Sequence, residues 1–284
     1  MIQKLSYLLL SVFITVTASA TEFTGKDAHK KFPGAERVLI NEISNVPSFI
    51  VFPDHVQIDE EKVMHLLRDG LGMNAEDSWK LYKIQKDKIG FTHKRFNQYY
   101  NNIKVETGEY ILHIKNGNVK HINGVFYDNL NINSSPSLSE ASALQSALDH
   151  IGARTYKWEN QIEEAYIKLF EDDMSATYYP KGELVIMAKD AVFKPEEREF
   201  RLCYKFDVYA DMPMSRDYVY VDAHNGEIVY KQSRICHGNA VGTANTRYAG
   251  TQTINTDSLS PTSYRLRDYT KGAGVLTWDL NNGT

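Results

Sequence analysis

The sequence predicts an α+β protein with two consecutive units, each an antiparallel sheet with one packed helix, followed by a hairpin-rich tail. Three patterns support this fold class: short runs in which apolar and polar residues alternate, two amphipathic helical stretches, and Asn-Gly turns between apolar runs. A sheet with a helix on one face is the natural way to bury such a pattern. The 284 residues are enough for two ordinary domains.

The first 20 residues have the layout of a secretory signal peptide. Lys4 precedes an apolar run over residues 8–16, and Ala18-Ser19-Ala20 is a small-x-small cleavage site. The run is too short to span a bilayer comfortably, and a buried core helix is the alternative interpretation. We therefore expect an exported protein with no stable membrane anchor.

Composition excludes one class of partner. Hydrophobic residues make up 42% of the chain and charged residues 24%, which is typical of globular proteins. The net charge of −4 is small and of the wrong sign for a nucleic-acid-binding protein. We expect no nucleic-acid partner.

The first unit is predicted to begin with a loosely ordered lead-in over residues 21–45, which are polar and mixed. A short strand follows between Pro47 and Pro53. Asp59 is expected to cap a helix whose apolar residues recur at helical spacing until Gly70 or Gly72 ends it. Residues 79–89 predict a strand or an irregular edge.

A meander is predicted next. Residues 91–100 and 108–115 form two strands, with Tyr110, Leu112 and Ile114 on one face of the second. Asn116-Gly117 favours a tight turn with positive φ, and Asn123-Gly124 is expected to break the returning strand.

The second unit follows a linker over residues 131–137. Ser137 and Glu140 fit a capping box for a helix that Gly152 ends. The strands expected after it cover residues 184–186, 200–208, 218–221 and 227–230. In the second of these strands, Cys203 faces away from Phe200, Leu202 and Tyr204.

The tail differs in composition from the rest of the chain. Only seven of the 47 residues from Gly238 to Thr284 are Val, Ile or Leu. So little apolar surface does not offset the ordering entropy of about 1–2 kcal/mol per residue. We expect these hairpins to need a core that lies elsewhere.

The first unit resembles the fungalysin/thermolysin propeptide domain. The residues that carry the resemblance are Phe96, Gln98, Tyr99, Val105, Gly117, Val119, Asn123 and Gly124. Asn102 departs from the pattern, since the family usually has Gly before the Ile-x-Val segment.

Two further resemblances follow along the chain. The helix LSEASALQSALDHIGA and the strands ending YVYVDAHNGEIVY resemble a PepSY domain. Ile235, Val241-Gly242, Ile254-Asn255-Thr256 and Trp278-Asp279 resemble the start of a thermolysin-type catalytic domain. The implied domains are a signal (1–20), a propeptide domain (21–131), a PepSY domain (132–234) and a truncated catalytic start (235–284).

The resemblance implies the precursor of a secreted zinc metalloendopeptidase, whose propeptide acts as intramolecular folding chaperone and inhibitor of its own catalytic domain. The parent enzyme would hold zinc, with calcium as a further possibility, and would cleave proteins or peptides. This chain contains no His-Glu-x-x-His motif, so we assign no catalytic residue and no metal ligand in it and expect it to be inactive alone. The alternative is a free-standing PepSY-type inhibitor or chaperone module.

Three features of single residues remain open. The resemblance places the maturation cut at Arg234–Ile235, although an exposed linker open to any protease would look the same. Cys203 and Cys236 are two unrelated thiols, a bridge tethering propeptide to enzyme, or, for Cys236, a thiolate on the zinc. His113 and His121 flank a hairpin and could meet across it; the simpler interpretation places both on the surface.

Overall fold

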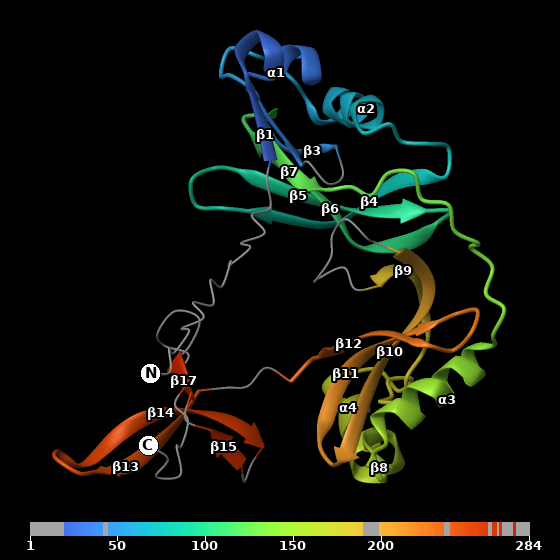
Figure 1. The fold of residues 1–284 in the computed structure, drawn as a ribbon, viewed down its shortest axis with the longest axis vertical. Helices are drawn as coiled ribbons and strands as arrows, with labels where there is room; N and C mark the ends of the chain where they lie inside the picture. Colours follow the sequence, from blue (N-terminus) through green and yellow to red (C-terminus); the bar gives the residue numbers. More distant parts are fainter. Residues whose placement is uncertain are drawn as a thin grey trace, which may run out of the picture. The chain divides into compact units, whose positions relative to one another are not determined.

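A computed structural model describes residues 20–41, 45–189, 199–235, 239–260, 263–265, 267–268 and 275–276. The chain divides into two compact units with the boundary between Ser134 and Ser135 (Figure 1). The secondary structure is mostly sheet with four α-helices in the described part, which confirms the predicted α+β class. Within the same residues, no helix has the length and apolar character needed to cross a membrane.

The sheet of unit 1 has the strand order β1-β2-β3-β7-β6-β5-β4, and all of its pairs are antiparallel. The strands are β1 (Ala20–Thr24), β2 (Arg37–Asn41), β3 (Pro47–Val51), β4 (Asp77–Lys86), β5 (Thr92–Tyr100), β6 (Ile103–Lys115) and β7 (Asn118–Val125). The predicted meander corresponds to β5, β6 and β7, with Tyr110 and Leu112 buried on one face and Ile114 packed against the same core.

Two helices, α1 (Gly25–Lys31) and α2 (Glu60–Gly70), contribute to the core of this sheet (Figure 1). The predicted cap of α2 is confirmed, because Asp59 accepts a hydrogen bond from the backbone of Lys62 at 2.9 Å. The prediction of a loosely ordered lead-in is wrong. Ala28 and Phe32 are fully buried in the core, so tertiary contacts order a helix that local composition does not favour.

The Asn116-Gly117 turn has positive φ at both residues, 51° and 78°, as predicted for a tight hairpin. The predicted break at Asn123-Gly124 is wrong, because β7 continues through both residues to Val125. Gly124 serves a close approach of backbones. A Cβ there would lie 2.2 Å from the carbonyl oxygen of Glu109 and 2.7 Å from Cα of Tyr110.

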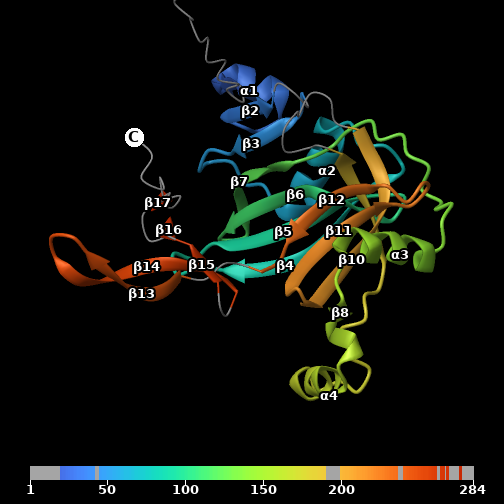
Figure 2. The same ribbon diagram turned by 60° about the horizontal axis from the view of Figure 1, so that its bottom comes forward.

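Unit 2 has a second antiparallel sheet in the order β9-β10-β11-β12, with the short β8 also paired to β10. Its strands are β8 (Thr155–Tyr156), β9 (Glu183–Lys189), β10 (Glu199–Met212), β11 (Ser215–Asp222) and β12 (Ile228–Ser233). Helix α3 (Glu140–Ile151) packs against β10 and β11 (Figure 2). Gly152 ends α3 in the left-handed conformation as predicted, but the cap is Ser139 rather than Ser137.

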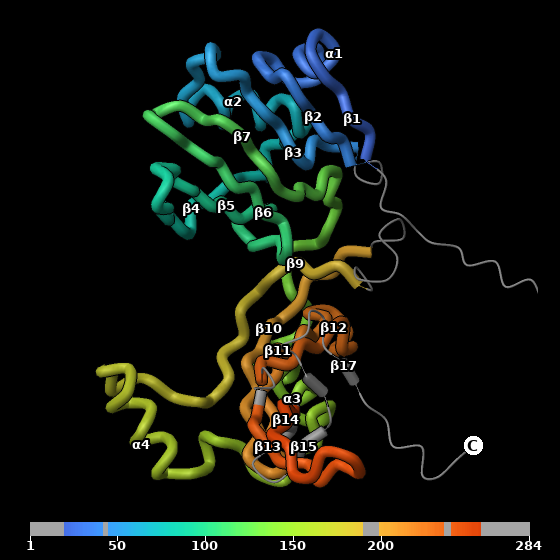
Figure 3. The backbone as a smooth tube through the Cα atoms, turned by 90° about the vertical axis from the view of Figure 1, so that its left-hand side faces the viewer, coloured from blue at the N-terminus to red at the C-terminus, as the bar shows by residue number. Residues whose placement is uncertain are grey.

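An arm between β8 and β9 was not predicted. It consists of the 3-10 turn η1 (Lys157–Glu159), helix α4 (Gln161–Phe170) and the loop that returns to β9. Figures 2 and 3 show α4 projecting away from the strands of unit 2. None of the α4 residues is buried, although six of the ten are apolar.

The tail contains β13 (Asn239–Thr246), β14 (Gly250–Ser260), β15 (Ser263–Arg265), β16 (Arg267–Asp268) and β17 (Val275–Leu276). Strands β13, β14 and β15 form one antiparallel sheet, and β16 pairs with β17. Val241 and Tyr248 are 75% and 92% exposed, so these side chains bury little apolar surface. Residues 1–19 of the predicted signal, Cys236 and Trp278-Asp279 lie outside the described residues.

We expect Gly124→Ala to destabilise unit 1 by about 3 kcal/mol or more, because the new methyl group collides with the backbone of β6. The matched control is Gly117→Ala, where the added Cβ meets open space and only the left-handed backbone costs about 1–2 kcal/mol. Urea unfolding followed by circular dichroism compares the two variants. Equal losses would contradict the close-approach role of Gly124.

Candidate functional site

The eight residues that carry the propeptide resemblance lie on β5, β6 and β7 or in the turn between β6 and β7. Phe96 and Val119 are buried in the core cluster, and Val105 is fully buried. Tyr99 is half-buried, with the ammonium group of Lys80 4.1 Å from its ring centroid. Most of these side chains therefore face the interior, where they contribute to folding.

Gln98 is the most constrained of the eight. It lies at an irregularity between β5 and β6, and its side chain is fully buried. Its amide nitrogen donates to the carbonyl of Tyr127 at 2.7 Å, and its amide oxygen accepts from the backbone N–H of Tyr127 at 3.0 Å. A Cβ at position 108 would lie 2.7 Å from that amide oxygen. This pair of hydrogen bonds leaves room only for glycine at position 108 of β6, and it anchors the segment that follows β7.

A row of three histidines crosses the same sheet. His93, His113 and His121 are direct cross-strand neighbours on β5, β6 and β7. The rings of His113 and His121 stack with centroids 4.1 Å apart, so the two residues meet across the hairpin. His93 Nδ1 lies 2.7 Å from His113 Nδ1, and His113 Nε2 lies 2.7 Å from Oδ1 of Asn123. Asn123 thus positions His113, the middle ring of the row.

Burial lowers the pKa of both His113 and His121 below 6.5. The neighbouring imidazoles lower both pKa values further, while the hydrogen bond to the amide oxygen of Asn123 raises the pKa of His113. Both rings are therefore expected to be neutral at pH 7. The described residues hold no cluster of three metal-ligating side chains of the His, Cys, Asp and Glu types, so the row is not assigned as a metal site.

The predicted cut at Arg234–Ile235 lies directly after β12. The backbone N–H of Arg234 donates to the carbonyl of Arg216 at 2.7 Å, which extends the β11–β12 ladder by one residue. The Arg234 guanidinium forms an ion pair with Asp207 and lies 4.5 Å from the ring centroid of Tyr218. Asp207 also accepts two bonds from Arg216, at 3.1 and 2.8 Å. We call Asp207, Arg216, Tyr218 and Arg234 the junction clamp.

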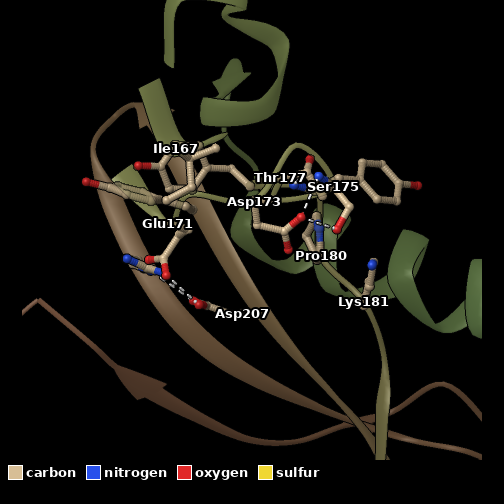
Figure 4. A pocket seen from close by; sticks show the side chains of 13 residues that line it. Ile167, Glu171, Asp173, Ser175, Thr177, Pro180, Lys181 and Asp207 are labelled. Atoms are coloured by element: carbon tan, nitrogen blue, oxygen red, sulfur yellow. Dashed lines mark hydrogen bonds and ion pairs between the residues drawn. The ribbon is translucent and has the colours of Figure 1, made fainter. Parts of the chain in front are cut away.

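A pocket of about 420 Å³ adjoins the junction clamp (Figure 4). Asp207, Tyr209 and Arg216 line it from the sheet, while Ile167 and Glu171 line it from α4 and the residue after it. The Tyr178 and Tyr209 rings meet edge to face at 5.5 Å in its wall. The pocket therefore connects the arm to the residues that hold Arg234.

Comparison with known proteins identifies relatives of both the motif and the longer chain. The family described as Fungalysin/Thermolysin Propeptide Motif matches residues 77–126, which contain all eight residues named above. Bacillolysin of Bacillus amyloliquefaciens is 29% identical over 213 residues, covering 74% of this chain and 37% of the relative. Bacillolysin of Brevibacillus brevis is 23% identical over 295 residues, covering 99% and 50%. Thermolysin of Alicyclobacillus acidocaldarius subsp. acidocaldarius is 25% identical over 232 residues, covering 75% and 38%.

This chain is a relative of the thermolysin-like metalloprotease precursors. It spans half or less of the length of these three curated relatives. Among solved structures, the Bacillus megaterium YpeB C-terminal domain aligns with 77% of this chain and 91% of that chain, at 12% identity and a TM-score of 0.33.

For this thermolysin relative, the structure adds residues that sequence reasoning missed. Asp207, Arg216 and Tyr218 hold Arg234, yet Asp207 lies 27 positions before it and carries no motif. Cys203 is fully buried beside Val185 and Tyr220, and burial raises the pKa of its thiol to about 12. Because Cys236 is outside the described residues, the proposed bridge to Cys203 stays a prediction.

We expect the stability of unit 1 to fall as pH drops below about 6.5. In that range His113 and His121 take up protons more readily in the unfolded chain than in the folded sheet, because folding lowers their pKa values. The variant His121→Phe keeps an aromatic ring against His113 but removes one titrating group, so the acid-side loss should shrink. Thermal unfolding at pH 7.5 and pH 5 measures the difference, with the exposed His65→Gln as control. An unchanged pH dependence in His121→Phe would contradict this assignment.

Trypsin tests the junction clamp directly, because it must take an arginine side chain into its specificity pocket. We expect Asp207→Asn to speed the cut after Arg234 by about two- to fivefold, the factor expected from an ion pair worth about 0.5–1 kcal/mol. Mass spectrometry of the fragments follows the rate relative to the cut after Arg247, whose side chain lies in the exposed β13–β14 turn. Glu199→Gln on the same strand is the charge-matched control. If both variants behave alike, Asp207 does not restrain Arg234.

Proposed function

We propose that this chain is the N-terminal part of a secreted zinc metalloendopeptidase precursor, comprising signal, propeptide and the first hairpins of the catalytic domain. The observation that carries the proposal is the propeptide-motif match at residues 77–126, in which Gln98 and Gly124 have specific structural roles. The relatives support the same reading, because their matches extend well beyond the motif. The PepSY assignment of residues 132–234 and the cut at Arg234–Ile235 are parts of this proposal.

The propeptide is proposed to act on its own catalytic domain in two ways. A β-rich catalytic domain has many non-local contacts and folds slowly, and a pre-folded partner can lower that barrier by binding the folding transition state. The same surface then blocks the active-site cleft until the junction is cut. The processed enzyme would be stable because its unfolding is slow.

Zinc, with calcium as a further possibility, belongs to the parent enzyme on this proposal. The described residues of this chain do not fit a zinc site, since they bring together no group of three ligands. The ligands would come from the part of the precursor that corresponds to the remaining length of the relatives. Protein or peptide substrates would be recognised there as well.

Inhibition in trans tests the proposal. The complete precursor is expressed and allowed to mature, and the 284-residue chain is added to the processed enzyme. We expect the added chain to inhibit casein hydrolysis in a concentration-dependent manner, because its two units supply the surface that covers the cleft. N-terminal sequencing of the processed enzyme should give a start within residues 233–240.

Two results would count against the proposal. A folded chain that leaves the enzyme fully active at high excess would exclude the inhibitory role. A processed N-terminus outside residues 233–240 would exclude the proposed junction while leaving the inhibitory role intact. If the gene encodes no protease domain and the chain still inhibits a thermolysin-like enzyme, the alternative of a free-standing inhibitor module would be favoured.

A further inference from the structure

Helix α4 carries a stripe of apolar side chains that face solvent. Ile162, Tyr166 and Leu169 recur at helical spacing and are 80%, 57% and 79% exposed. Phe170, which stacks on Tyr166 at 5.9 Å, and Met174 extend the stripe and are 69% and 80% exposed. We call these five residues the arm stripe. A contiguous apolar patch of this kind is typical of an interaction site.

The opposite side of the arm is fixed to unit 2 by polar and aromatic contacts. Lys157 is nearly buried and bridges Glu163 of α4, at 2.7 Å, to Asp211 of β10, at 3.0 Å. Glu164 accepts a hydrogen bond from the backbone of Tyr178 at 2.8 Å, which ties the returning loop to the helix. These contacts set the rotation of α4 about its own axis and direct the arm stripe outward.

Aromatic rings support the base of the arm. Trp158 stacks on Tyr156 with centroids 4.4 Å apart and meets Tyr179 edge to face at 5.6 Å. Asn160 caps α4 by accepting a hydrogen bond from the backbone of Ile162 at 3.0 Å. The arm is thus held to unit 2 by specific contacts, and the same contacts orient its apolar face toward solvent.

One pocket joins the arm to the residues that hold the end of β12. Ile167 and Glu171 share the 420 Å³ pocket with Asp207 and Arg216 (Figure 4), and Asp207 holds Arg234 at the end of the β12 ladder. Any domain attached after Ile235 therefore begins next to Arg234, whose partner Asp207 lines the same pocket as Ile167 of α4. The relatives extend well past the matched region, since this chain covers 37–50% of those named above.

We propose that the arm stripe forms the surface on which the catalytic domain of the same precursor docks. This inference rests on the proposed function and names the part of the propeptide that makes the contact. The fitting surface on the catalytic domain would be apolar at its centre. Its rim would be cationic, because Glu171, Asp172 and Asp173 follow directly after α4.

The test compares two double variants of the 284-residue chain as trans inhibitors of the processed enzyme. Ile162→Gln with Leu169→Gln changes the arm stripe, and Ile84→Gln with Ile89→Gln changes two exposed apolar residues of unit 1. All four side chains are at least half exposed, so neither variant should lower the thermal unfolding temperature. We expect the arm variant to weaken inhibition about tenfold or more, as loss of central interface contacts does, and the control to stay within about twofold.

Each outcome decides the inference. A selective loss of inhibition in the arm variant, with enzyme-induced protection of residues 161–174 from hydrogen exchange in the wild-type chain, supports it. Equal inhibition by both variants overturns the docking site but leaves the proposed function standing. No inhibition by the wild-type chain overturns the docking site together with the inhibitory role. Light scattering that finds a wild-type dimer, abolished by the arm variant while inhibition is unchanged, assigns the stripe to a second copy instead.

Discussion

The strands that match the propeptide motif, β4 to β7, depend on the hydrogen bonds of the buried Gln98 side chain. A buried polar group is costly unless its hydrogen bonds are satisfied, and here one side chain satisfies the N–H and the C=O of Tyr127 together. The pair holds the segment after β7 so that Phe126 lies against Trp79, with ring centroids 5.6 Å apart. It also leaves no space for a side chain at Gly108. A local irregularity in β5 thereby fixes positions on three other segments.

The elements that the sequence predicted well have local causes. Asp59 caps α2, Asn116-Gly117 turns the β6–β7 hairpin and Gly152 ends α3, each through its own backbone or the next few residues. The predictions that are wrong concern features with non-local causes. Helix α1 is ordered by burial of Ala28 and Phe32 against the rest of the core, and Gly124 reflects the approach of β6 rather than a turn. The arm is different, because its causes are also local: Asn160 caps α4, and apolar residues recur along it at helical spacing.

The residues of the candidate site also fall into those that the sequence predicts and those that only the fold brings together. The resemblance located Phe96, Gln98 and Gly124, which prove to be residues of the interior. It also predicts a cut at Arg234–Ile235, which stays a prediction, but it does not predict the side chains that hold Arg234. Asp207 and Tyr218 reach Arg234 from β10 and β11, and only the strand pairing brings them together. A motif that specifies a fold thus says little about the contacts that the fold makes possible.

Under the proposed function, the contact made by the arm stripe changes when the chain is cut after Arg234. While Arg234 and Ile235 are joined, the catalytic domain meets the arm stripe as part of one molecule, at an effective concentration that reaches the millimolar range for short linkers. A surface of only moderate affinity is then occupied almost completely. Once the bond after Arg234 is cut, the same contact becomes bimolecular and its occupancy falls with dilution. An exposed stripe of five apolar side chains therefore suits a partner that must be held before cleavage and released after it.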